Sequence, residues 1–98
     1  MVKKVVGDNF DEIKSSKIAV ADFSATWCGP CKMMAPVFHT VAEDMKDAIS
    51  FFNVDVDENP GLAASNKVFS VPTLILYKDG VEAVSYTHLR AHETRSNL

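Results

Sequence analysis

The two cysteines of this chain lie three residues apart, in the segment Trp27-Cys28-Gly29-Pro30-Cys31. Two thiols at this spacing close a small disulfide ring that can open and close as a chemical step. A structural disulfide instead acts mainly by closing a long loop. In thiol–disulfide exchange one thiolate attacks a disulfide, and a second thiol resolves the mixed disulfide that forms. The spacing therefore favours redox chemistry.

A helix predicted to begin at this segment gives the two cysteines different tasks. Cys28 lies at the helix start, where free N–H groups and the helix dipole favour a thiolate. Cys31 lies one turn further on, and we expect it to be more buried and to react second. Pro30 suits a first helical turn, Gly29 leaves room for an incoming disulfide, and Trp27 offers a flat apolar surface beside the sulfur.

Half of a zinc site is the alternative interpretation of the cysteine pair. A structural zinc ion needs four ligands, commonly from a second such pair or from paired histidines. The sequence has no other cysteine, and only His88 and His92, four residues apart, show any ligand spacing. The sequence therefore favours redox chemistry, and we expect neither a metal nor a bound cofactor.

One acidic residue interrupts the apolar run that precedes the cysteines. Asp22 lies six residues before Cys28, at the end of a predicted buried strand. A buried carboxyl group without a nearby cation has a raised pKa, and it could accept the proton of Cys31 during the second attack. The alternative is an acid that turns out to solvent, since buried aspartate is rare. The sequence leaves both open.

Composition limits the class of protein. The chain has 98 residues, 47% of them hydrophobic, which fits one small globular domain. Its net charge of −3 and lack of a basic run argue against nucleic acid as a partner. No apolar run approaches the roughly 20 residues of a membrane span, and the N-terminus lacks a signal-peptide core. We therefore expect a cytoplasmic protein, and in that reducing compartment a close cysteine pair favours redox activity.

Predicted strands alternate with predicted helices, which indicates an α/β fold. The strands are expected at residues 2–6, 18–23, 49–56, 73–77 and 81–85, and the helices at 9–15, 31–46 and 62–66. Lys78-Asp79-Gly80 is expected to form a hairpin turn.

These residues together resemble the thioredoxin family. The resemblance runs from about Val2 to Val84 and is carried by Asp22-Phe23, the Trp27–Cys31 segment, Pro36, Asn59-Pro60-Gly61, Val71-Pro72-Thr73 and Lys78-Asp79-Gly80. It implies the thioredoxin fold, a central mixed five-stranded sheet flanked by helices. It also implies a protein-disulfide reductase in which Cys28 attacks, Cys31 resolves and Asp22 is the buried acid.

The resemblance further implies a substrate groove and partners. Pro72 would be a cis-proline beside the active site, and Val71 would offer backbone hydrogen bonds to an extended client peptide. The partners would be client proteins with disulfides and a flavin-containing, NADPH-dependent thioredoxin reductase. The protein would act as a monomer.

Three positions depart from the family pattern. Asn53 stands where many members have a lysine near the buried acid, and Ser24 occupies a position that is often aromatic. After Val84 the pattern ends, and the long amphipathic C-terminal helix is absent. We therefore expect a thioredoxin domain at residues 1–85 and an atypical tail at 86–98, with the C-terminal helix truncated or replaced.

Two other functions are compatible with parts of the sequence. A truncated thioredoxin-like module that binds partners, or a non-functional fragment, would fit the unusual tail. An exported oxidising or isomerising relative would fit the cysteine pair, although Gly-Pro between the cysteines and the missing signal peptide argue against it.

Overall fold

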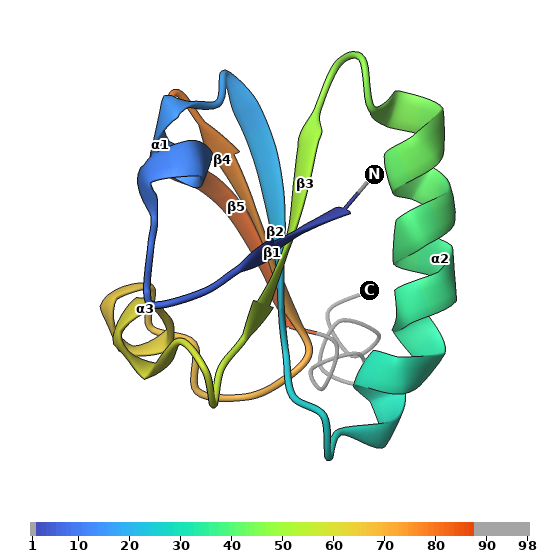
Figure 1. Cartoon of the computed structure of the whole chain (residues 1–98), viewed down its shortest axis with the longest axis vertical. Coiled ribbons are helices and arrows are strands. Elements are labelled where there is room, and N and C mark those ends of the chain that lie inside the picture. Colours follow the sequence, from blue (N-terminus) through green and yellow to red (C-terminus); the bar gives the residue numbers. More distant parts are fainter. Residues whose placement is uncertain (1, 88–98) are drawn as a thin grey trace, which may run out of the picture.

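The computed structural model describes residues 2–87 and forms one sheet flanked by helices (Figure 1). The strands lie in the order β1-β3-β2-β4-β5. Their bounds are Val2–Val5 for β1, Ile18–Ser24 for β2, Ser50–Asp55 for β3, Thr73–Lys78 for β4 and Val81–Thr87 for β5. β3 pairs in parallel with β1 and β2, whereas β4 pairs antiparallel with β2 and β5. The predicted mixed five-stranded sheet is confirmed.

Three helices cover the sheet. α1 (Asp11–Ser15) and α3 (Pro60–Ser65) lie on one face, and α2 (Gly29–Met45) lies on the other (Figure 1). All eight predicted elements are present, with bounds that differ by at most two residues from those predicted. Each helix starts two residues from its predicted start, and α2 begins at Gly29, so that both Gly29 and Pro30 belong to its first turn.

The face under α1 and α3 holds a closed apolar core. Alternate residues of β2 point to this face, and their side chains, Ala19, Ala21 and Phe23, are completely buried. They pack with other buried residues of the same cluster, among them Ile13, Val54, Leu62, Ile75 and Tyr77. The ring of Phe10 meets the ring of Tyr77 edge to face, with centroids 5.3 Å apart.

The face under α2 has a smaller core and an open groove. Phe38 and Phe51 are buried and meet edge to face at 5.5 Å between ring centroids. Beside them lies an apolar groove of about 350 Å³. It is lined by Val20, Met34, Val37, Phe38, Val41, Met45, Ile49, Phe51 and Leu74. Within residues 2–87, α2 is the only helix on this face.

The hairpin between β4 and β5 has the predicted turn. Asp79 and Gly80 both have positive φ, at 53° and 83°, as the common two-residue hairpin turn requires. A Cβ atom on Gly80 would also lie 2.9 Å from the carbonyl oxygen of Lys14. β5 continues to Thr87, two residues past the predicted domain boundary. Residues 88–98, and with them the predicted loss of the C-terminal helix, lie outside the described part of the chain.

Candidate active site

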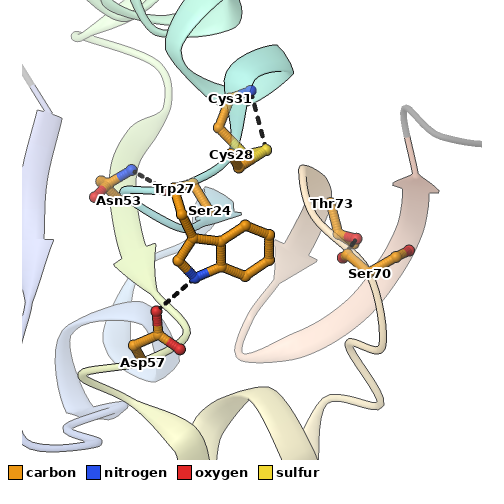
Figure 2. The surroundings of a disulfide bond; sticks show 8 residues. All are labelled: Ser24, Trp27, Cys28, Cys31, Asn53, Asp57, Ser70 and Thr73. Carbon is orange, nitrogen blue, oxygen red and sulfur yellow. Dashed lines mark hydrogen bonds between the residues drawn. A yellow bond between two sulfur atoms is a disulfide. The ribbon is translucent and has the colours of Figure 1, made fainter.

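Cys28 and Cys31 form a disulfide at the N-terminus of α2 (Figure 2). Cys28 is the N-cap residue, and its sulfur accepts a hydrogen bond from the backbone N–H of Cys31 at 3.2 Å. The first turn of α2 contains no acidic residue, so the positive end of the helix dipole is not offset there. When the disulfide opens, this position favours a thiolate on Cys28.

The expected difference in burial between the two cysteines is wrong for the disulfide form. Both residues are 5% exposed. They share one cluster with Ala25 and Val71, and the disulfide holds both sulfurs in it. The two cysteines are therefore distinguished by their places in the helix. Cys28 caps the helix, whereas Cys31 lies within the first turn.

Open space lies beside Gly29, between the two cysteines in the sequence. A Cβ atom on Gly29 would meet nothing within 4 Å. Trp27 is 69% exposed, although its indole Nε1 donates a hydrogen bond to Oδ2 of Asp57 at 2.9 Å. This bond holds the indole beside the cysteine pair (Figure 2).

The loop before β4 lies on one side of the cysteine pair. The Val71–Pro72 peptide bond is cis, as the family resemblance implied. Val71 packs against the disulfide cluster, and Thr73 Oγ1 donates to the carbonyl oxygen of Ser70 at 2.7 Å. A pocket of about 150 Å³ runs between this loop and the indole of Trp27. Its lining also includes Phe69, which is 88% exposed.

Asp22 is buried, which excludes the alternative that it turns out to solvent. The residue is 2% exposed, and within residues 2–87 its Oδ1 has no hydrogen-bond partner. Burial raises the pKa of Asp22 to about 6, while the side-chain amide of Asn53 and the charge of His39 act in the opposite direction. The acid therefore changes protonation state near neutral pH.

The acidic turn after β3 has a structural role. Oδ1 of Asp55 accepts hydrogen bonds from the backbone N–H groups of Asp57 and Glu58. The fully buried Asn59 donates to the carbonyl oxygens of Val5 and Asp55, so the turn is tied to β1. No group of three or more potential metal ligands occurs in the described part of the chain.

Two features of the site were not predicted from the sequence. One is the contact between Trp27 and Asp57, which are 30 residues apart in the sequence. The other is a hydrogen bond of 3.0 Å from Nδ2 of Asn53 to Oγ of Ser24. In the sequence, Ser24 and Asn53 stand out only as two separate departures from the family pattern. Their places near the ends of two adjacent strands were the available signal.

A Cys-x-x-Cys disulfide that caps a helix directly after a central strand defines a thiol–disulfide oxidoreductase. Comparison with known proteins agrees. The thioredoxin family model matches residues 1–97. The chain belongs to the thioredoxin family.

Individual relatives support the same assignment. The chain is 51% identical over 79 residues to a thioredoxin of Staphylococcus haemolyticus (strain JCSC1435), covering 81% of this chain and 76% of the relative. It is 49% identical over the same length to a thioredoxin of Staphylococcus saprophyticus. Its structure is similar to that of a mutant thioredoxin from Halobacterium salinarum, with a TM-score of 0.82 and 36% identity, over 98% of this chain and 85% of that one.

Membership of the family and the cysteine pair make this chain a disulfide oxidoreductase. Among residues 2–87, no helix has the length and apolar character that crossing a membrane would require.

Proposed function

We propose that the chain reduces disulfides in client proteins through the Cys28–Cys31 couple. The thiolate of Cys28 attacks one sulfur of a client disulfide, forms a mixed disulfide and releases the other client sulfur as a thiolate. Cys31 then attacks the sulfur of Cys28, which releases the second client sulfur and closes the Cys28–Cys31 disulfide. Two electrons pass to the client. The helix-capping position of Cys28 is the observation that carries this assignment.

Asp22 serves as the proton acceptor for Cys31 in the second step. Its buried carboxyl group, with a pKa of about 6, is largely ionised at pH 7, yet it accepts a proton more readily than an exposed aspartate. This role follows from the match to the family's buried acid, and its burial at the end of β2 supports it.

An extended client segment binds to a surface beside the cysteine pair. This surface is formed by Trp27, Gly29, Pro30, Val71 and Pro72. The open space above Gly29 and the exposed indole of Trp27 support this role. The pocket between Trp27 and Val71 adds Phe69 to the same surface. The backbone of Val71 provides hydrogen bonds to the client, since an extended peptide exposes unpaired N–H and C=O groups.

The couple is returned to the dithiol by an NADPH-dependent thioredoxin reductase, so the chain needs no cofactor of its own. It acts as a monomer in the cytoplasm, where it takes part in electron transport and cell redox homeostasis. These assignments rest on the family, and the reducing conditions of the cytoplasm suit a pair that must spend part of each cycle as free thiols.

Reduction of insulin by a dithiol donor tests the proposal with two matched variants. Cys31→Ser is expected to accumulate a covalent adduct with the client through Cys28 and to lose turnover by several orders of magnitude. Cys28→Ser is expected to lose turnover without any adduct. Turnover retained in Cys28→Ser would contradict the proposal. A folded wild-type chain that binds clients without reducing them would favour the binding-module alternative.

A further inference from the structure

A hydrogen-bonded pair of side chains lies between the buried acid and solvent. Asn53 on β3 is the register partner of Asp22 on β2. Its side-chain amide lowers the pKa of the Asp22 carboxyl group, against the larger effect of burial. The same amide donates through Nδ2 to Oγ of Ser24, two residues further along β2. Ser24 and Asn53 are both half-buried, whereas Asp22 is 2% exposed. Ser24 and Asn53 are therefore closer to solvent than the acid beside them.

A pocket of about 180 Å³ opens on the outer side of this pair. Ser24, Asn53 and the buried Cys31 line it, and the exposed residues Lys4, Thr26 and Lys32 form its rim. It is large enough to hold several waters. Figure 2 shows Asn53 and Ser24 to one side of the cysteine pair and the Ser70–Thr73 turn to the other. The pocket thus lies apart from the proposed client surface.

The surroundings of Asp22 offer few other polar groups. Its register partner on β4 is the apolar Leu74. From α2, the charge of His39 lowers the pKa of the carboxyl group. Around the pocket, Lys4 and Lys32 contribute positive charge and Asp55 contributes negative charge. Asn53 is thus both the register partner of Asp22 and a residue that lines the pocket.

We propose that Ser24 and Asn53 are positioning residues of the reaction: Ser24 holds the Asn53 amide between Asp22 and the pocket behind Cys31, and the proton taken from Cys31 leaves to water there. This inference rests on the proposed role of Asp22. In the second step the thiol proton of Cys31 passes to the Asp22 carboxylate while the disulfide bond moves from the client to Cys31. The carboxylic acid then returns its proton to water in the pocket. A client bound at Trp27 and Val71 leaves this exit open.

The test is the pH profile of client release from the Cys28 mixed disulfide in a single turnover, together with the titration of the Asp22 carboxyl carbon by NMR. Asn53→Leu keeps the side-chain size but removes the amide, so both midpoints are expected to rise by about one pH unit. For a carboxylate base with a pKa near 6, that rise slows release about fivefold at pH 6 and about twofold at pH 7. Ser24→Ala is expected to give a smaller rise, and Ser24→Thr, which keeps the hydroxyl group, restores the wild-type midpoint.

Midpoints that stay within about 0.3 pH unit of wild type in both Asn53→Leu and Ser24→Ala would overturn the inference. Ser24→Ala also covers the case in which Asn53→Leu does not fold. Asp22→Asn separates this result from a failure of the proposed function. If Asp22→Asn leaves the release rate and its pH profile unchanged, the assignment of Asp22 as proton acceptor is wrong. If it slows release and removes the midpoint near pH 6, leaving only the rise that follows ionisation of the Cys31 thiol itself, shifts in the other variants report on the pair alone.

Discussion

The two faces of the sheet differ in how completely their apolar side chains are buried. On the face under α1 and α3, residues such as Phe23 and Ile75 are at most 1% exposed and form a closed core. On the face under α2, the buried pair Phe38 and Phe51 borders an apolar groove of about 350 Å³. Val37 on this groove is 62% exposed. One face thus supplies most of the hydrophobic stabilisation, while the other leaves apolar surface in water.

The residues proposed to carry the reaction lie on the α2 face, where the apolar side chains are less completely buried. Along β2, side chains alternate between faces, so that Asp22 and Ser24 share the α2 face with Val20 of the groove. The closed face anchors the strands, and the α2 face carries the cysteine pair, the buried acid and the pocket beside it. Stability and function can therefore be perturbed separately, and neighbouring residues of one strand provide the test.

The largest effect is expected at Ile75, which points into the closed core. Ile75→Ala should lower the free energy of unfolding by about 2–5 kcal/mol, because it leaves an enclosed cavity among well-packed neighbours. Urea unfolding followed by circular dichroism measures the change. A loss below about 1 kcal/mol would mean that this face is not the main source of stability.

Asp22→Asn should raise stability, in the opposite direction to its effect on activity. The pKa of Asp22 is raised from 3.8 to about 6 in the folded chain, so its ionisation opposes folding as pH rises between these values. At pH 7 the neutral amide should therefore add up to about 3 kcal/mol to the free energy of unfolding. At pH 3.5 the gain should vanish, since the carboxyl group is then protonated in the folded chain and mostly protonated in the unfolded one.

Unfolding curves of wild type and Asp22→Asn at the two pH values provide the measurement. An equal gain at both would show that the substitution acts through packing instead of through ionisation. Cys28→Ser and Asp22→Asn together would also show whether the cost of burying the acid depends on the redox couple.

The smallest effect is expected at Leu74, the neighbour of Ile75 on the opposite face. Leu74 lines the open groove and is only partly buried, so Leu74→Ala should cost about 1–2 kcal/mol, less than Ile75→Ala. No enclosed cavity forms, because water already reaches the groove. A cost equal to that of Ile75→Ala would show that the groove is closed in solution and that the two faces are equivalent.

The sequence predicts the elements well because most of them carry a local signal. The apolar run of β2, the helix-starting Cys28–Pro30 segment and the Asp79-Gly80 turn each depend on neighbours within a few residues. The family resemblance then supplied the sheet type and the cis bond at Val71–Pro72, to which local sequence gives only a small prior.

The contacts that the sequence could not predict join residues distant along the chain. The bond from Trp27 to Asp57 spans 30 residues, and the bond from Asn53 to Ser24 spans 29. Each depends on the register between strands and on loop conformation, and neither is encoded in a local pattern. The equal burial of Cys28 and Cys31 is unpredictable for a related reason, since it depends on packing against Val71, which is distant in the sequence.

The chain holds two cysteines in total, and both belong to the couple. The number of free thiols on the chain therefore reports its redox state: none in the oxidised form, two in the reduced form and, on the chain itself, one when a client is attached. A colorimetric thiol titration of the purified chain reads its redox state without labels or correction for background thiols. The same arithmetic leaves the chain no spare sulfur through which to cross-link to another copy while its own disulfide is closed.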